Sequence, residues 1–104
     1  MIRVICRIRD GQPCGFRITG HAGAGLAGED IVCAAVSSAA YMTANTITEI
    51  LGLPADITVD EGLMDVTVSE NTAACAALLS GFRLHMQALQ EQYPRRVQLM
   101  NTEV

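Results

Sequence analysis

Apolar and polar residues alternate at the beginning of the chain. Positions 2, 4, 6 and 8 are apolar, and arginines stand at positions 3, 7 and 9. This period of two predicts a strand with one buried face, and Asp10 and Gly11 predict the turn that follows it. A second strand over residues 15–19 would return beside the first, so the chain is expected to open with a β-hairpin.

Two longer segments have the spacing of helices. Residues 31–51 are mostly apolar or small, and Gly52 and Pro54 end the segment. The scarcity of polar residues predicts the central helix of the fold, with most of its first half buried. A second helix is expected from about Thr72 until Pro94 ends it, with a core-facing stripe made of Cys75, Leu78, Leu79, Phe82, Met86, Leu89 and Tyr93.

The remaining segments predict three more strands. Residues 56–60 and 64–68 form a second hairpin around Glu61 and Gly62, and residues 96–100 form the last strand. The order ββαββαβ predicts an α+β fold, with a mostly antiparallel sheet and two helices packed on one face, in a single domain spanning residues 1–104. The pattern does not predict which strands are neighbours.

Composition and charge narrow the class of partner. The 104 residues are 50% hydrophobic and carry a net charge of −4, and the basic residues are all arginines. A solvated sheet face is expected to carry Arg3, Arg7, Arg9 and Arg17. An acidic surface favours basic protein partners, and no direct nucleic-acid binding is expected. Because the chain lacks a signal-like apolar run at its start and any stretch of membrane-spanning length, we expect a cytoplasmic protein with no membrane contact.

The cysteines form no metal-binding or redox pattern. They stand far apart without a CxxC pair, so neither a metal nor a cofactor is expected. Cys6 and Cys75 fall on predicted core faces and Cys14 follows a turn proline, so these three are expected to be structural. His85 lies at the edge of the second helical stripe and is expected to pack there.

The glycines before the first helix match a nucleotide-binding loop only in spacing. Gly23, Gly25 and Gly28 spell GxGxxG between a predicted strand and a predicted helix. Glu29 and Asp30, however, would place two negative charges beside a pyrophosphate, and the preceding strand belongs to a hairpin rather than to a βαβ unit. A phosphate-loop ATPase is excluded because the chain has no lysine.

A histidine and a cysteine flank this glycine-rich segment. Asp30 fits the N-cap of the helix, which puts Cys33 in the first turn, where unpaired N–H groups and the helix dipole favour a thiolate and can hold an oxyanion. His21, at the other end of the connection, is a candidate base. A thiol phosphatase needs an arginine separated from its cysteine by five residues, and the chain has none there, so acyl transfer is favoured. A structural Cys33 remains an alternative, and Asp30 either caps the helix alone or also orients His21.

Residues 21–37, HAxxxxxGxDIVCAAVS, resemble the ribosomal-processing cysteine protease family Prp, also called YsxB-like. The order of hairpin, loop, long helix, hairpin and helix resembles that family over nearly the whole chain. The resemblance implies that His21 and Cys33 form a catalytic dyad and that the protein is a homodimer. It also implies a substrate, the N-terminal extension of large-ribosomal-subunit protein twenty-seven, removed after a short hydrophobic segment that ends in an aromatic residue.

The residues and the resemblance together predict a cysteine endopeptidase that supports ribosome assembly. Cys33 would be the nucleophile and His21 the general base and acid, with Asp30 supporting the site. A flexible loop would open for a peptide and close over it, leaving the N–H groups of Cys33 and its neighbours facing the scissile carbonyl; it comprises Ala22, Gly23, Ala24, Gly25, Leu26, Ala27 and Gly28. The alternative is a non-catalytic, ribosome-associated binding module in which Cys33 is buried.

Overall fold

A computed structural model describes residues 1–21 and 30–104 of the chain. The elements run in the order β1 (Ile2–Arg9), β2 (Gln12–Gly20), α1 (Ile31–Asn45), η1 (Thr46–Ile50), β3 (Ala55–Asp60), β4 (Leu63–Val68), α2 (Ala73–Gln92) and β5 (Val97–Glu103). The element η1 is a single π-helical turn that continues α1. This order is the ββαββαβ order expected from the sequence.

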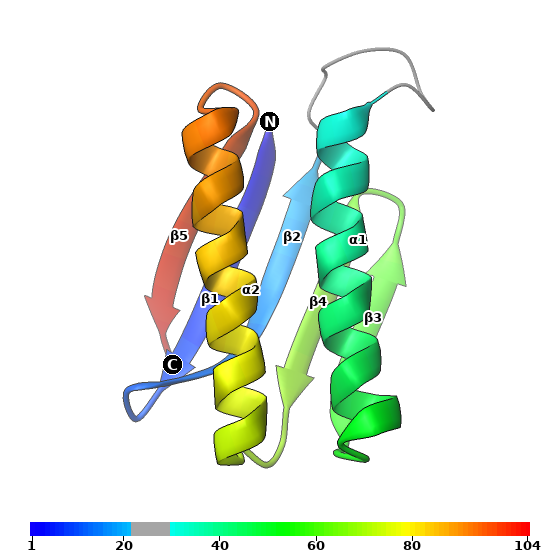
Figure 1. Ribbon diagram of the computed structural model, residues 1–104, viewed down its shortest axis with the longest axis vertical. Helices are drawn as coiled ribbons and strands as arrows, with labels where there is room; N and C mark the ends of the chain where they lie inside the picture. Colours follow the sequence, from blue (N-terminus) through cyan, green and yellow to red (C-terminus); the bar gives the residue numbers. More distant parts are fainter. Residues whose placement is uncertain (22–29) are drawn as a thin grey trace.

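The strands form a five-stranded sheet in the order β3-β4-β2-β1-β5, and both helices lie on one of its faces (Figure 1). Strands β1 and β5 are parallel, whereas the other three neighbouring pairs are antiparallel. The predicted α+β class with a mostly antiparallel sheet is therefore confirmed. Strand β2 belongs to a hairpin with β1, which agrees with the argument against a βαβ nucleotide fold.

The core lies between the sheet and the two helices. Its centre is an aromatic pair, Phe16 of β2 stacked on Phe82 of α2 with ring centroids 4.2 Å apart. Cys6, Cys14 and Cys75 are buried around it, as expected of structural cysteines. Burial raises the pKa of the Cys6 thiol to about 11, and Arg83 offsets this only in part; burial also raises the pKa of Cys75. Such thiols stay protonated and unreactive at neutral pH.

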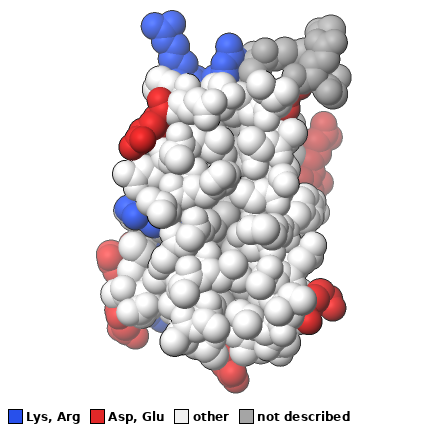
Figure 2. All heavy atoms as spheres, in the orientation of Figure 1, with Lys and Arg blue, Asp and Glu red and all other residues white. Residues whose placement is uncertain are grey.

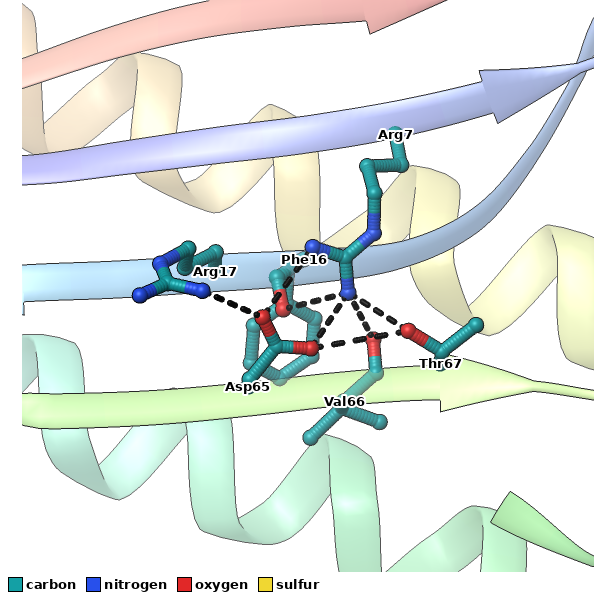
Figure 3. A network of polar contacts seen from close by, with 6 residues as sticks. All are labelled: Arg7, Phe16, Arg17, Asp65, Val66 and Thr67. Carbon is teal, nitrogen blue, oxygen red and sulfur yellow. Dashed lines mark hydrogen bonds and ion pairs between the residues drawn. The ribbon is translucent and has the colours of Figure 1, made fainter. Parts of the chain in front are cut away.

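The open face of the sheet carries an ion-pair network instead of a helix layer (Figure 3). The guanidinium of Arg7 donates to both carboxylate oxygens of Asp65 at 2.5 and 3.1 Å, and also to the hydroxyl of Thr67 at 2.6 Å. Arg17 donates to Asp65 at 3.4 Å. These contacts confirm the prediction for Arg7 and Arg17, which lie on the sheet face opposite the helices.

The contacts of Arg7 with the Asp65 carboxylate stabilise the fold by an amount that depends on pH. Partial burial raises the pKa of Asp65, but the hydrogen bonds and charge of Arg7, with Arg17 and Thr67, outweigh it and leave the pKa below its ordinary value. A carboxyl whose pKa is lower in the folded state stabilises the fold above its ordinary pKa. That stabilisation is lost as the pH falls through the folded-state value.

Three expectations about the helices need correction. Most of the first half of α1 is not buried: only Val32, Val36 and Ala40 are buried there, and Cys33, Ala35 and Ala39 are partly exposed at the edge of the core. His85 is exposed on α2 instead of packed. The helical run Ile31–Ile50 does reach membrane-spanning length, with a mean hydropathy of 1.2, although a core helix with a buried stripe has the same properties. For α1, the number of apolar residues does not reveal how narrow the stripe that packs against the core is.

Candidate active site

The first turn of α1 has the expected cap. A carboxylate oxygen of Asp30 accepts hydrogen bonds from the backbone N–H groups of Val32 and Cys33, each at 3.0 Å. Asp30 has an extended backbone, as an N-cap residue should. One sequence expectation fails here, because the N–H of Cys33 donates to Asp30 and so does not face outward toward a substrate carbonyl.

Cys33 differs from the other three cysteines in its exposure. Its side chain is half-buried against the edge of the core, whereas the others are fully buried. It stands in the first turn of α1, where the positive end of the helix dipole favours a thiolate. The sulfur is therefore placed where a nucleophile could be both activated and reached.

His21 directly follows β2, and contacts with neighbouring strands hold its backbone. The N–H of Gly20 donates to the carbonyl of Gly62 at 3.0 Å, and the amino group of Met1 donates to the carbonyl of His21 at 2.5 Å. Gly62, in the turn between β3 and β4, lies beneath the imidazole. A Cβ atom on Gly62 would stand 3.3 Å from Nε2, 3.9 Å from Cδ2 and 4.0 Å from Cε1. The imidazole can occupy this position because Gly62 has no side chain.

His21 and Cys33 line the same pocket, which has a volume of about 160 Å³. Helix α1 forms one wall with Val36 and Tyr41, and the hairpin of β3 and β4 forms the other. The structure therefore places at one pocket two residues that eleven others separate in the sequence. It places them in a recess that is open at the surface and mainly apolar.

The second hairpin adds residues to this pocket that the sequence does not predict there. Val59, Asp60 and Gly62 line it from β3 and the following turn. They lie about forty positions after the histidine, and the pairing of β4 with β2 brings them beside it. The single local signal is the turn at Glu61 and Gly62, which the sequence marks as a turn but not as part of a site.

Two of the sequence predictions concern residues that the structure does not describe. The proposed substrate loop, Ala22, Gly23, Ala24, Gly25, Leu26, Ala27 and Gly28, lies outside the described residues, as does the GxGxxG match within it. Over residues 1–21 and 30–104, no group of three or more histidine, cysteine or acidic side chains could hold a metal ion.

A second, larger hollow of about 700 Å³ lies between α1 and α2 on the outer face of the helices. Apolar and small residues line most of it, including Ala39, Met42 and Leu78, and His85 stands at one side. The face of the molecule that carries the two helices shows almost no charge across its middle (Figure 2). Neither His21 nor Cys33 lines this hollow.

Residues 1–98 match the family described as "Cysteine protease Prp". The chain belongs to this family. The Prp match covers both hairpins, both helices and the pocket with His21 and Cys33. No curated protein matches the chain in sequence.

Solved structures share the fold over its full length. A Prp from S. aureus, described as an essential ribosomal processing protease with a covalently linked product peptide, is 26% identical with a TM-score of 0.92 and covers 98% of this chain and 100% of its own. The same kind of S. aureus protein with a substrate peptide is 25% identical, with a TM-score of 0.87 and the same coverage. SMU.848 from Streptococcus mutans is 30% identical with a TM-score of 0.87, covering 100% of this chain and 96% of its own.

Proposed function

We propose that this protein is a cysteine endopeptidase in which Cys33 is the nucleophile and His21 the general base and acid. Its proposed substrate is large-ribosomal-subunit protein twenty-seven, whose N-terminal extension it removes so that the protein can function in the ribosome. The observation that carries the proposal is the pocket. His21, which follows β2, and Cys33 of α1 both line it, and Cys33 is the one cysteine of the four that is not buried.

The proposed reaction needs no group beyond these two residues and water. The Cys33 thiolate attacks the scissile carbonyl, and His21 donates a proton to the departing amine, which leaves a thioester on the enzyme. His21 then takes a proton from water, the hydroxide attacks the thioester, and the peptide acid departs as the thiol is restored. Asp30 supports this chemistry by fixing the first turn of α1 beneath the sulfur.

The pocket suits the aromatic residue expected before the scissile bond. A cavity of about 150 Å³ lined by apolar side chains holds a benzene ring. The pocket beside Cys33 is of that size, about 160 Å³, and its lining includes Val36, Val59 and Met64. We assign it the side chain on the amino side of the cleaved bond.

Mass spectrometry of a cleavage reaction tests this proposal. The protein is incubated with the extended ribosomal protein and with a matched substrate whose aromatic residue before the junction is replaced by aspartate. We expect loss of the extension from the first substrate only. An intact first substrate at high enzyme concentration would overturn the proposal.

A non-catalytic binding module with a buried cysteine receives no support from the described residues, because Cys33 is half-buried and lines an open pocket.

The location we propose is the cytoplasm, where the ribosomal substrate is assembled.

Gly62 offers a test of how His21 is positioned. We expect Gly62→Ala to lower the cleavage rate about tenfold, because the new Cβ would press on Nε2 from 3.3 Å and shift the ring. Gly11→Ala is the matched control, since Gly11 also sits in a hairpin turn at a positive φ, 76° against 68°, with nothing within 4 Å of the added atom. Both variants should lose similar stability, and steady-state kinetics should separate them. Equal rates for the two would refute a positioning role.

We further propose that the uncharged helix face is where a second copy binds. Met42 of α1 lines the 700 Å³ hollow and is 63% exposed, and Leu84 of α2, which precedes the lining residue His85, is 68% exposed. Large exposed apolar patches mark association surfaces. A homodimer joined there would cover these side chains and leave the Cys33 pocket at the other side of α1 open to substrate.

The oligomeric state of charged variants tests this interface. We expect the protein to sediment as a dimer, and Met42→Glu with Leu84→Glu to shift it to monomer, with a dissociation constant at least about a hundredfold higher. Met100→Glu is the control, because Met100 is 39% exposed on β5 and faces away from the helices. A dimer that persists in the double variant, or that Met100→Glu disrupts equally, would place the interface elsewhere.

A further inference from the structure

Strand β3 is an edge strand that leads into the pocket of Cys33 and His21. Among the described residues it pairs only with β4. Its last two residues, Val59 and Asp60, line the pocket. An unpaired strand edge is a row of backbone donors and acceptors ready to bind another extended chain. The free edge of β3 ends at the pocket that His21 and Cys33 line.

The register of the hairpin shows which backbone groups face outward. Asp60 pairs with Leu63 across the two-residue turn, so this pair exchanges both of its hydrogen bonds. The pattern then alternates along the hairpin, and Thr58 and Asp56 also use their N–H and C=O groups toward β4. The N–H and C=O groups of Ile57 and Val59 therefore point away from the sheet, toward the free edge.

The side chains of the same two residues are apolar and exposed. Ile57 pairs with Val66 and Val59 with Met64, so both project on the helix side of the sheet. Yet Ile57 is 42% and Val59 52% exposed, whereas Val66 and Met64 are buried. Strand β3 also lacks the lysine or arginine that protects many strand edges. Ile57 and Val59 thus present both free backbone hydrogen-bonding groups and exposed apolar side chains.

We infer that the hydrophobic segment of the substrate binds as a sixth strand along the outer edge of β3, an inference that rests on the proposed peptidase function. Strand β3 runs toward the pocket and ends beside it at Asp60. A segment whose carboxyl end reaches Cys33 must run in the same direction, so the added strand is parallel to β3. Alternate side chains of the segment lie over Ile57 and Val59, and the last one enters the pocket.

This mode of binding separates the peptide bonds of the substrate into two sets. N–H groups at every second position face β3, and those between face solvent. Ile57→Pro should remove one outward donor without loss of a bond to β4, because proline is tolerated on a strand edge when its nitrogen faces away from the ladder. Ile57→Ala is the matched variant, since it removes the same side chain and keeps the N–H group.

Binding of synthetic peptides tests the inference independently of catalysis. The dissociation constant is measured on Cys33→Ala protein for the hydrophobic segment and for its singly N-methylated forms, and Ile57→Pro and Ile57→Ala are introduced in the same background. We expect N-methylation at alternate positions to weaken binding about tenfold and at the others less than about threefold. Ile57→Pro should weaken binding about tenfold more than Ile57→Ala.

The outcomes distinguish this inference from the function on which it rests. An N-methylation series without a period of two, or equal binding by the two Ile57 variants, would overturn the strand-addition mode even if the parent protein cleaves the substrate. Lack of cleavage by the parent protein, with the alternating pattern intact, would instead contradict the peptidase and leave a peptide-binding edge.

Discussion

Replacing Cys33 with alanine is expected to abolish cleavage of the extended ribosomal substrate, with a loss of at least about 10⁴-fold in kcat. The thiolate is the atom that forms the covalent bond, and no other described cysteine can replace it because Cys6, Cys14 and Cys75 are buried. His21→Ala should cost a similar factor, because the pocket then has no imidazole to activate the thiol and to protonate the leaving amine. Two residues that act as one unit are expected to show non-additive losses.

Matched variants control for unrelated effects of these substitutions. His85→Ala removes the other histidine, which is exposed and lines the hollow between the helices, and Cys75→Ala removes a buried thiol. Both should cleave at the parent rate once the folded fraction is taken into account. Turnover by Cys33→Ala or His21→Ala at the parent rate would end the dyad proposal.

The largest loss of stability is expected from Phe16→Ala. Phe16 is fully buried at the centre of the sheet and stacks on Phe82, which joins β2 to α2. Its removal forfeits burial of a whole ring and leaves a cavity that rigid strands cannot fill, at a cost of about 3 to 5 kcal/mol. Urea denaturation followed by circular dichroism measures the loss. Gln87→Ala, at an exposed position of α2 that does not line the hollow between the helices, should change the free energy of unfolding by less than about 0.5 kcal/mol.

A small effect of Phe16→Ala would contradict this account of the core. If the free energy of unfolding fell by less than about 1 kcal/mol, the space between sheet and helices would have to close around the missing ring. The stack on Phe82 would then contribute little to holding β2 in place, and with it His21 at the end of that strand.

Much of the fold could be predicted from local patterns. The alternation at Ile2, Val4 and Cys6 reports burial of one strand face, and all three are buried. The turns at Gly11 and Gly62 could be located because both adopt a positive φ, which glycine accepts without strain. The cap at Asp30 was predictable for a similar reason, since its geometry depends on only three following residues.

Features that depend on distant pairings could not be predicted in the same way. Nothing in residues 96–100 indicates that β5 pairs in parallel with β1, because the order of strands is a property of the whole chain. The contribution of Val59 and Gly62 to the pocket depends on the pairing of β4 with β2. The broad exposure of α1 was missed because alanines are compatible with either a core or an interface between chains.

The pH dependence of Cys33 alkylation shows whether His21 activates the thiol. Iodoacetamide should report on Cys33 first, because the other three thiols are buried. We expect Cys33 in the parent protein to react at clearly lower pH than an ordinary thiol, and His21→Ala to move the profile to higher pH. Superimposable profiles for the parent and His21→Ala, or a Cys33 that resists alkylation as a buried thiol does, would contradict the pairing of His21 with Cys33.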